Sequence, residues 1–389
     1  MSRAAVATAD VDRRSAIAGV TILGVVGSIV FLLLPLLVGA FTETLSLGTR
    51  QVGYLGSADM VGMFLAAVLA TLWVRRWDWR RAGAAAAGLL AVSHLVSAFL
   101  AGLVPLLVVR VVAGFAGGSL MSIALTSLGD TRGPDRWFAV FISGQLGLGA
   151  LALWRMPQLI AAWGLRGVFL VLALLTVAAA LCLPLIPRRG RPRVPDAGDG
   201  EAPRSIVPGA MALAGCLAFN TGIMAVWAYM ERIGDAAGLA ASAIGDVLGV
   251  ALLGGLFGAL IAAALGDRLG RVVPLVTAVA LQFLALWLIA GRPSTAAFGA
   301  GVLLFSFCWN FPVAYQLAVT VSVDSSNRLV VLFLSAVKLG YAIGPALAAQ
   351  LIASSDGFGV VIVLGGACFL LSGAVFLPLA WMAGRRREA

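Results

Sequence analysis

The sequence predicts an all-α integral membrane protein with twelve transmembrane helices in two pseudo-symmetric six-helix bundles. Of its 389 residues, 61% are hydrophobic and only 11% are charged, and the mean hydropathy is +1.03. In soluble domains about 25% of residues are charged. Apolar runs long enough to cross a hydrocarbon core of about 30 Å recur along the whole chain, as membrane helices require. One polar stretch, 187–205, divides these runs into two groups of similar length.

The membrane spans follow from these runs in order. Before the polar stretch they are 16–38, 51–74, 82–103, 105–128, 137–160 and 166–186. After it they are 206–230, 241–265, 272–290, 296–321, 329–352 and 359–382. Glycines recur in the fourth and eighth spans, and such small residues allow membrane helices to approach closely.

The segments outside the spans give the orientation. Most of the 27 Lys and Arg residues lie near the chain ends, in 187–205 and in every second loop, and the side richer in them is cytoplasmic. This basic excess therefore indicates topology and does not indicate nucleic acid binding. We expect a multi-pass protein of the plasma (inner) membrane with both termini cytoplasmic. Its parts are a tail at 1–15, a bundle at 16–186, a flexible linker at 187–205, a bundle at 206–383 and a tail at 384–389.

Three short motifs resemble those of the major facilitator superfamily. Gly266-Asp-Arg-Leu-Gly-Arg271 follows the eighth predicted span at a cytoplasmic turn, Arg110-Val-Val-Ala-Gly114 lies in the fourth span, and Gly340-Tyr-Ala-Ile-Gly-Pro345 lies in the eleventh. The resemblance implies two six-helix bundles, a central cavity and transport by alternating access.

The same resemblance implies roles for individual residues. Asp267, Arg268 and Arg271 would form a charge-relay contact that opens and closes during gating, and Arg110 would take part in proton coupling. The matching turn of the first half departs from the motif, with Arg75 in place of the Asp and Asp78 in place of the second Gly. The fifth span has no Gly-Pro, which the drug antiporter branch carries there.

Ionisable side chains inside the spans are candidate coupling groups, because a charge near the bilayer centre costs at least about 2.5 kcal/mol and needs a partner. Asp59 and Lys338 both fall near the midplane of their spans. We expect an Asp59–Lys338 pair that breaks or re-forms during transport, with Asp59 as the proton carrier. The alternatives are a static pair, or Asp59 held by Arg110 within the first bundle.

A second charged pair is expected near the outer ends of two other spans. Asp246 on the eighth span and Arg155 on the fifth could form a gating contact. Alternatively, Arg155 extends to the outer headgroups beside Trp154. His94, the only histidine, is expected to be a core residue with satisfied hydrogen bonds.

Neutral polar residues on spans that border the central cavity are candidate substrate-binding groups. These residues are Gln145, Asn220, Trp309, Asn310, Tyr315 and Gln316. Amides and aromatic rings suit a small organic solute with hydrogen-bonding groups and a flat part. Three intramembrane cations against two aspartates favour an anionic or zwitterionic solute. Interhelical hydrogen bonds alone are the alternative role for each residue.

Together these features predict a secondary active transporter that moves a small organic solute by alternating access, coupled to protons. No GxxxxGK[ST] motif is present, and the four cysteines are scattered singly. We therefore expect a monomer that is not an enzyme and uses no metal or cofactor. A drug or metabolite efflux antiporter of the same fold and a membrane sensor that does not transport are the alternatives. A membrane-embedded acyl or glycosyl transferase is a further alternative, against which the single histidine and the lack of a metal-ligand cluster count.

Overall fold

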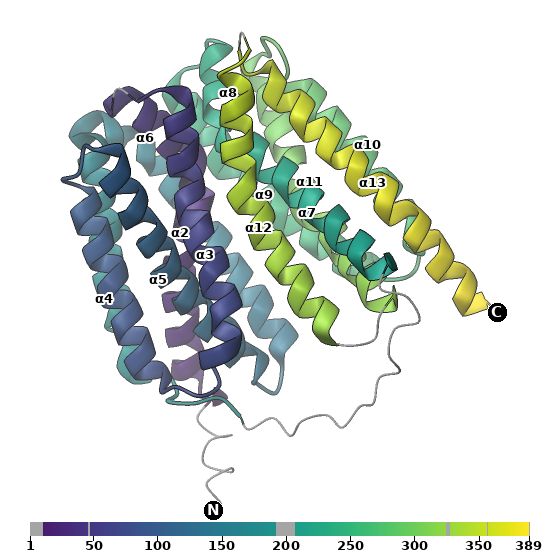
Figure 1. Cartoon of the computed structure of the whole chain (residues 1–389), viewed down its shortest axis with the longest axis horizontal. Coiled ribbons are helices and arrows are strands. Elements are labelled where there is room, and N and C mark those ends of the chain that lie inside the picture. Colours follow the sequence, from purple (N-terminus) through teal and green to yellow (C-terminus); the bar gives the residue numbers. More distant parts are fainter. Residues whose placement is uncertain (1–10, 46, 192–206, 324–326, 356, 389) are drawn as a thin grey trace, which may run out of the picture. The chain divides into compact units, whose positions relative to one another are not determined.

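The computed structural model describes residues 11–45, 47–191, 207–323, 327–355 and 357–388, and all regular structure in these ranges is helical (Figure 1). The first half contains α2 (Arg14–Thr44), α3 (Thr49–Trp73), α4 (Trp79–Ser97), α5 (Leu103–Gly129), α6 (Pro134–Ala180) and the short 3₁₀ helix η1 (Leu183–Leu185). The second half contains α7 (Val207–Ala228), α8 (Met230–Ala236), α9 (Ala241–Leu265), α10 (Val272–Ile289), α11 (Thr295–Val323), α12 (Asn327–Ile352) and α13 (Gly359–Glu388).

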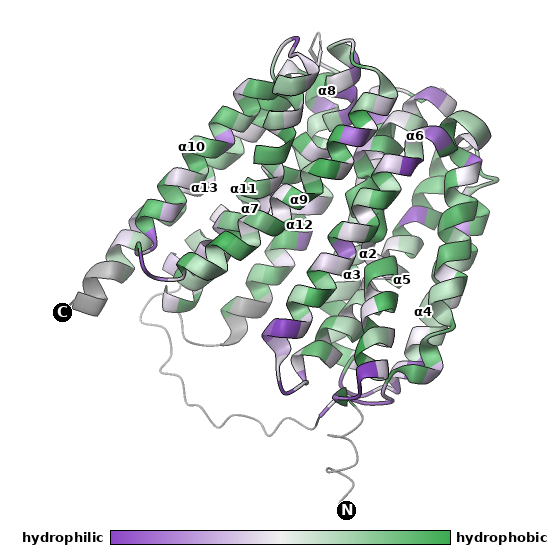
Figure 2. Ribbon diagram, turned by 180° about the vertical axis from the view of Figure 1, so that it is seen from behind, coloured by the Kyte–Doolittle hydropathy of each residue, from purple (hydrophilic) through white to green (hydrophobic). Residues whose placement is uncertain are grey.

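These helices confirm the predicted fold class. Within the described ranges, ten of them are long and apolar enough to cross a membrane, with α6 and η1 counted as one span. The shorter α4 and the second part of α6 complete the twelve predicted spans. The segment labelled α6 consists of two helices joined at Gly164, where φ is 61°, a value that favours glycine. Figure 2 shows hydrophobic residues along the helices and hydrophilic residues concentrated at their ends.

The chain divides into two compact units. Unit 1 comprises Met1–Leu47, Ala58–Gly149 and Gln158–Gly198, and unit 2 comprises Gly48–Ser57, Ala150–Pro157 and Asp199–Ala389. The predicted bundles were 16–186 and 206–383. Residues 1–10 and 192–205 of the predicted tail and linker lie outside the described residues, as do the side chains of 384–389.

Unit 1 is built around α5, against which both α2 and α4 pack. Glycines bring the α2 and α5 backbones together, because a Cβ at Gly27 would lie 2.7 Å from the Gly117 carbonyl oxygen. Such close approach increases van der Waals contact between membrane helices, which is what drives their association in lipid.

Unit 2 uses the same device where α12 packs against α7. A Cβ at Gly340 would lie 2.8 Å from the Asn220 Cβ, and one at Gly344 would lie 2.6 Å from the Thr221 carbonyl oxygen. The two glycines are one turn apart on the same face of α12. The Gly-x-x-x-Gly spacing of the eleventh span therefore forms the α7–α12 contact.

The close approach at Gly340 predicts that alanine lowers stability there but not at a glycine with free space around it. Replacing Gly340 with Ala should destabilise unit 2, because overpacking against backbone costs roughly 1–3 kcal/mol. Gly147→Ala in α6 is the matched control, since an added Cβ there meets nothing within 4 Å and alanine favours a helix. Thermal unfolding in detergent should show a lower midpoint for Gly340→Ala only. Equal midpoints for both variants would contradict the packing argument.

Candidate functional site

The interior of unit 1 contains an ion pair between α3 and α5. Arg110 Nε donates to Asp59 Oδ2 at 2.9 Å, and a second guanidinium nitrogen donates to Asp59 Oδ1 at 2.5 Å. The side chains are only 1% and 5% exposed. A two-point pair of this kind fixes both distance and orientation, so Asp59 and Arg110 act as one buried unit.

The remaining guanidinium nitrogen of Arg110 is directed at α4. It lies 3.2 Å from His94 Nδ1 and donates to Ser97 Oγ at 3.4 Å. A guanidinium can only donate hydrogen bonds, so His94 Nδ1 accepts and the imidazole is the neutral Nε2–H tautomer. The guanidinium also lies 5.0 Å from the ring centre of Phe169, which stacks on His94. Arg110 thus has polar or aromatic partners on three neighbouring segments.

Glycines allow α3 and α5 to come close enough for this pair. A Cβ at Gly114 would overlap the Asp59 carbonyl oxygen, and one at Gly62 would overlap the Val111 carbonyl oxygen. Arg110 and Gly114 are four residues apart, hence on one face of α5. The Arg-x-x-x-Gly spacing therefore joins a charged group to the contact that positions its partner.

A second cluster lies in unit 2, on α7, α11 and α12. The Lys338 ammonium lies 5.4 Å from the ring centre of Tyr341, whose hydroxyl accepts a hydrogen bond from Trp309 Nε1 at 2.7 Å. Trp309 packs edge-on against Trp227 at 5.5 Å between ring centres. Trp309 and Lys338 were predicted site residues, whereas Trp227 and Tyr341 were not. The cluster places a cation on an aromatic surface.

The sequence of the chain is similar to that of a known protein family. A sequence model of the Major Facilitator Superfamily matches residues 17–309. The chain belongs to the Major Facilitator Superfamily. No curated protein sequence is a significant match.

Solved transporter structures of the superfamily share the fold at low sequence identity. A peptide transporter is 16% identical, with 99% of each chain covered and a TM-score of 0.76. A nucleoside transporter is 12% identical, with 95% of this chain and 99% of that chain covered and a TM-score of 0.72. A D-xylose–proton symporter is 14% identical, with 95% and 96% covered and a TM-score of 0.70. At these identities the likeness shows the fold alone.

The predicted coupling residues belong to different units of the chain. The Asp59–Arg110 contact, weighed as an alternative in the sequence, is present in unit 1. Lys338 belongs to unit 2, so the Asp59–Lys338 pair stays a prediction. His94, expected in the core, is buried, but its contact with Arg110 was missed because sequence spacing does not relate α4 to α5.

The neutral polar residues lie mostly inside their own units. Gln145 Nε2 donates to Ser28 Oγ on α2 at 2.6 Å, and Asn220 Nδ2 donates to the Cys216 carbonyl of its own helix at 2.8 Å.

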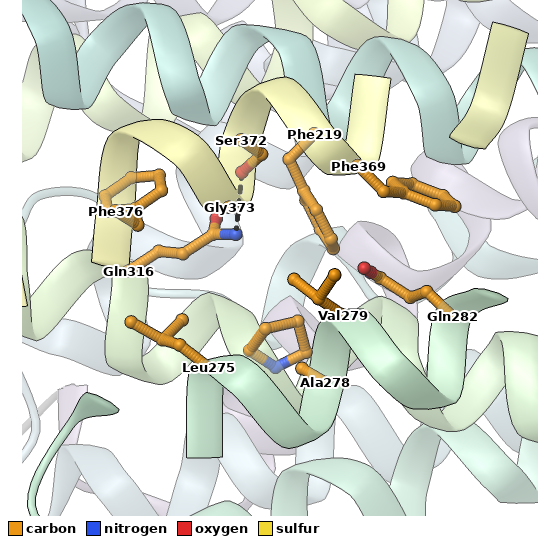
Figure 3. Close-up of a pocket in the computed structure, with 11 residues that line it drawn as sticks. Phe219, Leu275, Ala278, Val279, Gln282, Gln316, Phe369, Ser372, Gly373 and Phe376 are labelled. Carbon is orange, nitrogen blue, oxygen red and sulfur yellow. Dashed lines mark hydrogen bonds between the residues drawn. The ribbon is translucent and has the colours of Figure 1, made fainter. Parts of the chain in front are cut away.

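Gln316 Nε2 donates to Ser372 Oγ at 3.4 Å beside a small cavity (Figure 3). Tyr315 packs edge-on against Phe311, and Asn310 lies against Gly255. Their substrate-binding roles stay predictions.

The expected outer contact involves two residues of unit 2. Arg155 lies over the ring of Trp154, 4.7 Å from its centre, and Trp154 and Asp246 line one groove. The stacking is the arrangement expected if Arg155 extends toward headgroups. The Asp246–Arg155 gating contact stays a prediction.

The turn after α9 explains why the motif 266–271 has two glycines. Gly266 and Gly270 have φ of 50° and 63°, values that favour glycine. Arg271 Nε lies 3.7 Å from Asp267 Oδ1, and Arg271 also donates to the Ala318 carbonyl of α11 at 2.9 Å. Arg268, by contrast, is exposed. The gating roles of these three charged residues stay predictions.

Asp78 and Arg75, the two residues at which the first-half turn departs from the motif, have structural roles. Asp78 caps α4 by accepting hydrogen bonds from the backbone N–H groups of Arg80 at 2.9 Å and Arg81 at 3.1 Å. Arg75 pairs with Asp130 at 2.5 Å, and Asp130 also accepts from the Arg191 N–H at 3.0 Å. The described start of the predicted linker therefore contacts unit 1 through Asp130.

The buried Asp59–Arg110 pair predicts how single and double variants change the free energy of unfolding. Arg110→Gln or Asp59→Asn alone should cost about 3–5 kcal/mol, because each leaves an uncompensated charge in the interior. The double variant should recover part of this loss. Thermal unfolding in detergent measures all three.

The control for the pair is Arg132→Gln. Arg132 is 85% exposed and pairs with Asp12 at 3.5 Å, and exposed pairs contribute about 0–1 kcal/mol. If the Asp59–Arg110 double variant were as unstable as the two single losses combined, the two residues would not act as a pair.

Proposed function

We propose that the chain is a secondary active transporter that moves a small organic solute across the plasma membrane by alternating access, coupled to protons. Its superfamily membership and membrane-spanning helices support transport in general. The observation that carries the proposal is the buried Asp59–Arg110 pair, because it is a titratable group held inside a membrane-spanning unit by a partner that stays charged.

Protonation of Asp59 would change the hydrogen bonding of this pair. A carboxylate accepts from both Arg110 nitrogens, whereas a carboxylic acid has lost one acceptor site and its charge. Arg110 would then depend on His94, Ser97 and Phe169, which already surround it. Each proton that crosses a potential of 100 mV supplies about 2.3 kcal/mol, which is enough to drive solute accumulation.

The Lys338 cluster supports an anionic or zwitterionic solute. An ammonium group on an aromatic surface offers charge to a carboxylate and a flat apolar face to the rest of the solute. The amides of Asn220 and Asn310 are proposed as further solute contacts. The named solutes of the solved structures are a sugar, peptides and nucleosides, so fold alone does not select a solute.

Proton coupling predicts a separation of two activities in Asp59→Asn. In proteoliposomes with an imposed pH gradient, a library of small solutes should contain at least one that the wild type accumulates only with the gradient. The variant should retain exchange of that solute but lose accumulation. Retained exchange also shows that the variant is folded.

The control for this measurement is Asp235→Asn, because Asp235 is 58% exposed and lies outside the buried pair. It should accumulate solute like the wild type. If Asp59→Asn accumulates solute normally, Asp59 is structural, and the coupling assignment fails.

The Lys338 assignment predicts a charge-dependent loss of affinity. Lys338→Gln should weaken competition by anionic analogues roughly tenfold to a hundredfold, because a hydrogen bond to a charged group contributes about 1.5–3 kcal/mol. Neutral analogues should be affected less, and Lys338→Arg should retain part of the affinity. Arg292→Gln, at an exposed turn, is the control. An equal loss for anionic and neutral analogues would show that Lys338 does not bind the solute's charge.

A further inference from the structure

Unit 2 encloses a small cavity between α7, α10, α11 and α13, whose lining includes no residue of the Lys338 cluster (Figure 3). Most of its lining is apolar and includes Phe219, Leu275, Phe369 and Phe376. Three polar side chains interrupt this lining, and they are Gln282, Gln316 and Ser372. None of the lining residues is charged.

The polar side chains of the cavity are buried and incompletely hydrogen-bonded. Gln282 is 2% exposed, and Gln316 and Ser372 are each 3% exposed. Gln316 Nε2 donates to Ser372 Oγ, but Gln316 Oε1 and Gln282 Nε2 have no hydrogen-bond partner among the described residues. Figure 3 shows the two side chains extending toward each other from opposite sides of the cavity, with the Gln282 oxygen drawn at the inner end. The cavity thus presents one unused acceptor and one unused donor.

We propose that this cavity is a binding site for one water molecule, which accepts from Gln282 Nε2 and donates to Gln316 Oε1. An occupant must do both, and water can donate two hydrogen bonds and accept two. The space open to the centre of a water molecule is about 10 Å³, close to the minimum that one water needs. Water also fits if either amide is rotated by 180°, because it can exchange the two roles.

Other occupants are excluded by charge and size. A metal cation would need several oxygen ligands and a compensating negative charge, and the lining supplies no carboxylate. An anion would lack a cationic partner in the same lining. An apolar occupant would leave both amide atoms unsatisfied, which is the unfavourable outcome in a buried site.

The water site lies where α11 is weakened. Pro312 of α11 also lines the cavity, and a proline inside a helix removes the hydrogen bond to the carbonyl four residues earlier, here Cys308. Through the water, Gln316 on α11 is linked to Gln282 on α10, and Gln316 also bonds Ser372 on α13. The hydrated site therefore joins three helices beside the proline. It does not depend on which solute the protein carries.

A double-mutant cycle tests whether Gln282 and Gln316 share one bound water. Gln282→Leu and Gln316→Leu should each lower the unfolding midpoint in detergent by about 2–4 °C, because each leaves the other amide unsatisfied. The double variant should lose less than the sum, since both partners of the water are then apolar. As a control, Gln282→Leu combined with Gln145→Leu should be additive, because Gln145 bonds Ser28 in the other unit.

Hydroxyl-radical labelling in ¹⁸O water detects the water itself. Radicals formed from a bound water oxidise adjacent side chains even where bulk solvent has no access. Phe369 and Phe376, 0% and 1% exposed, should be labelled in the wild type and several-fold less in the Gln282→Leu/Gln316→Leu variant. An additive cycle, unlabelled phenylalanines in the wild type, or equal labelling in both proteins would each overturn the water site.

Discussion

The hydrocarbon core offers no hydrogen-bond partner, so each polar group buried between the helices needs one within its own unit. Arg110 shows how demanding this constraint is. Its guanidinium requires a carboxylate on α3, an imidazole and a hydroxyl on α4, and the face of Phe169. Hydroxyl groups meet the same need more simply, because Ser28 and Thr176 each donate to the carbonyl four residues earlier, at 2.8 Å. The charged group thus ties α3, α4 and the Phe169 segment of α6 to its own helix, α5.

Close helix packing is what allows such partners to meet. The Gly114 contact brings the α5 backbone against Asp59, and the Gly340 and Gly344 contacts bring α12 against α7. Apolar side chains cannot provide this approach through the hydrophobic effect, because lipid tails are as apolar as leucine. Two of the motifs that resemble superfamily signatures, Arg110–Gly114 and Gly340–Gly344, are therefore local packing devices, and the Asp59–Arg110 pair forms where the first of them brings α3 and α5 together.

The spans could be predicted from the sequence because hydropathy and length alone identify a membrane helix. The break at Gly164, where φ is 61°, falls in the gap 161–165 that the predicted spans 137–160 and 166–186 leave between them. At the site, the cost of a buried charge identified Asp59 and Arg110 correctly as groups in need of partners. The pairing itself, the role of His94 and the Trp227–Trp309 contact depend on how separate helices pack. No spacing along one helix contains that information.

The Asp59–Arg110 pair of unit 1 and the small cavity of unit 2 differ in whether their polar groups can change charge. In unit 1, Asp59 and His94 both contact Arg110, so a proton gained by the carboxylate would alter the bonding of a group that connects α5 to its neighbouring helices. Around the cavity of unit 2, the polar groups are two amides and a hydroxyl, and none of these changes charge at physiological pH. Under the proposed proton coupling, protonation of Asp59 would rearrange the polar contacts of Arg110, whereas the hydrogen bonds around the cavity of unit 2 would stay the same.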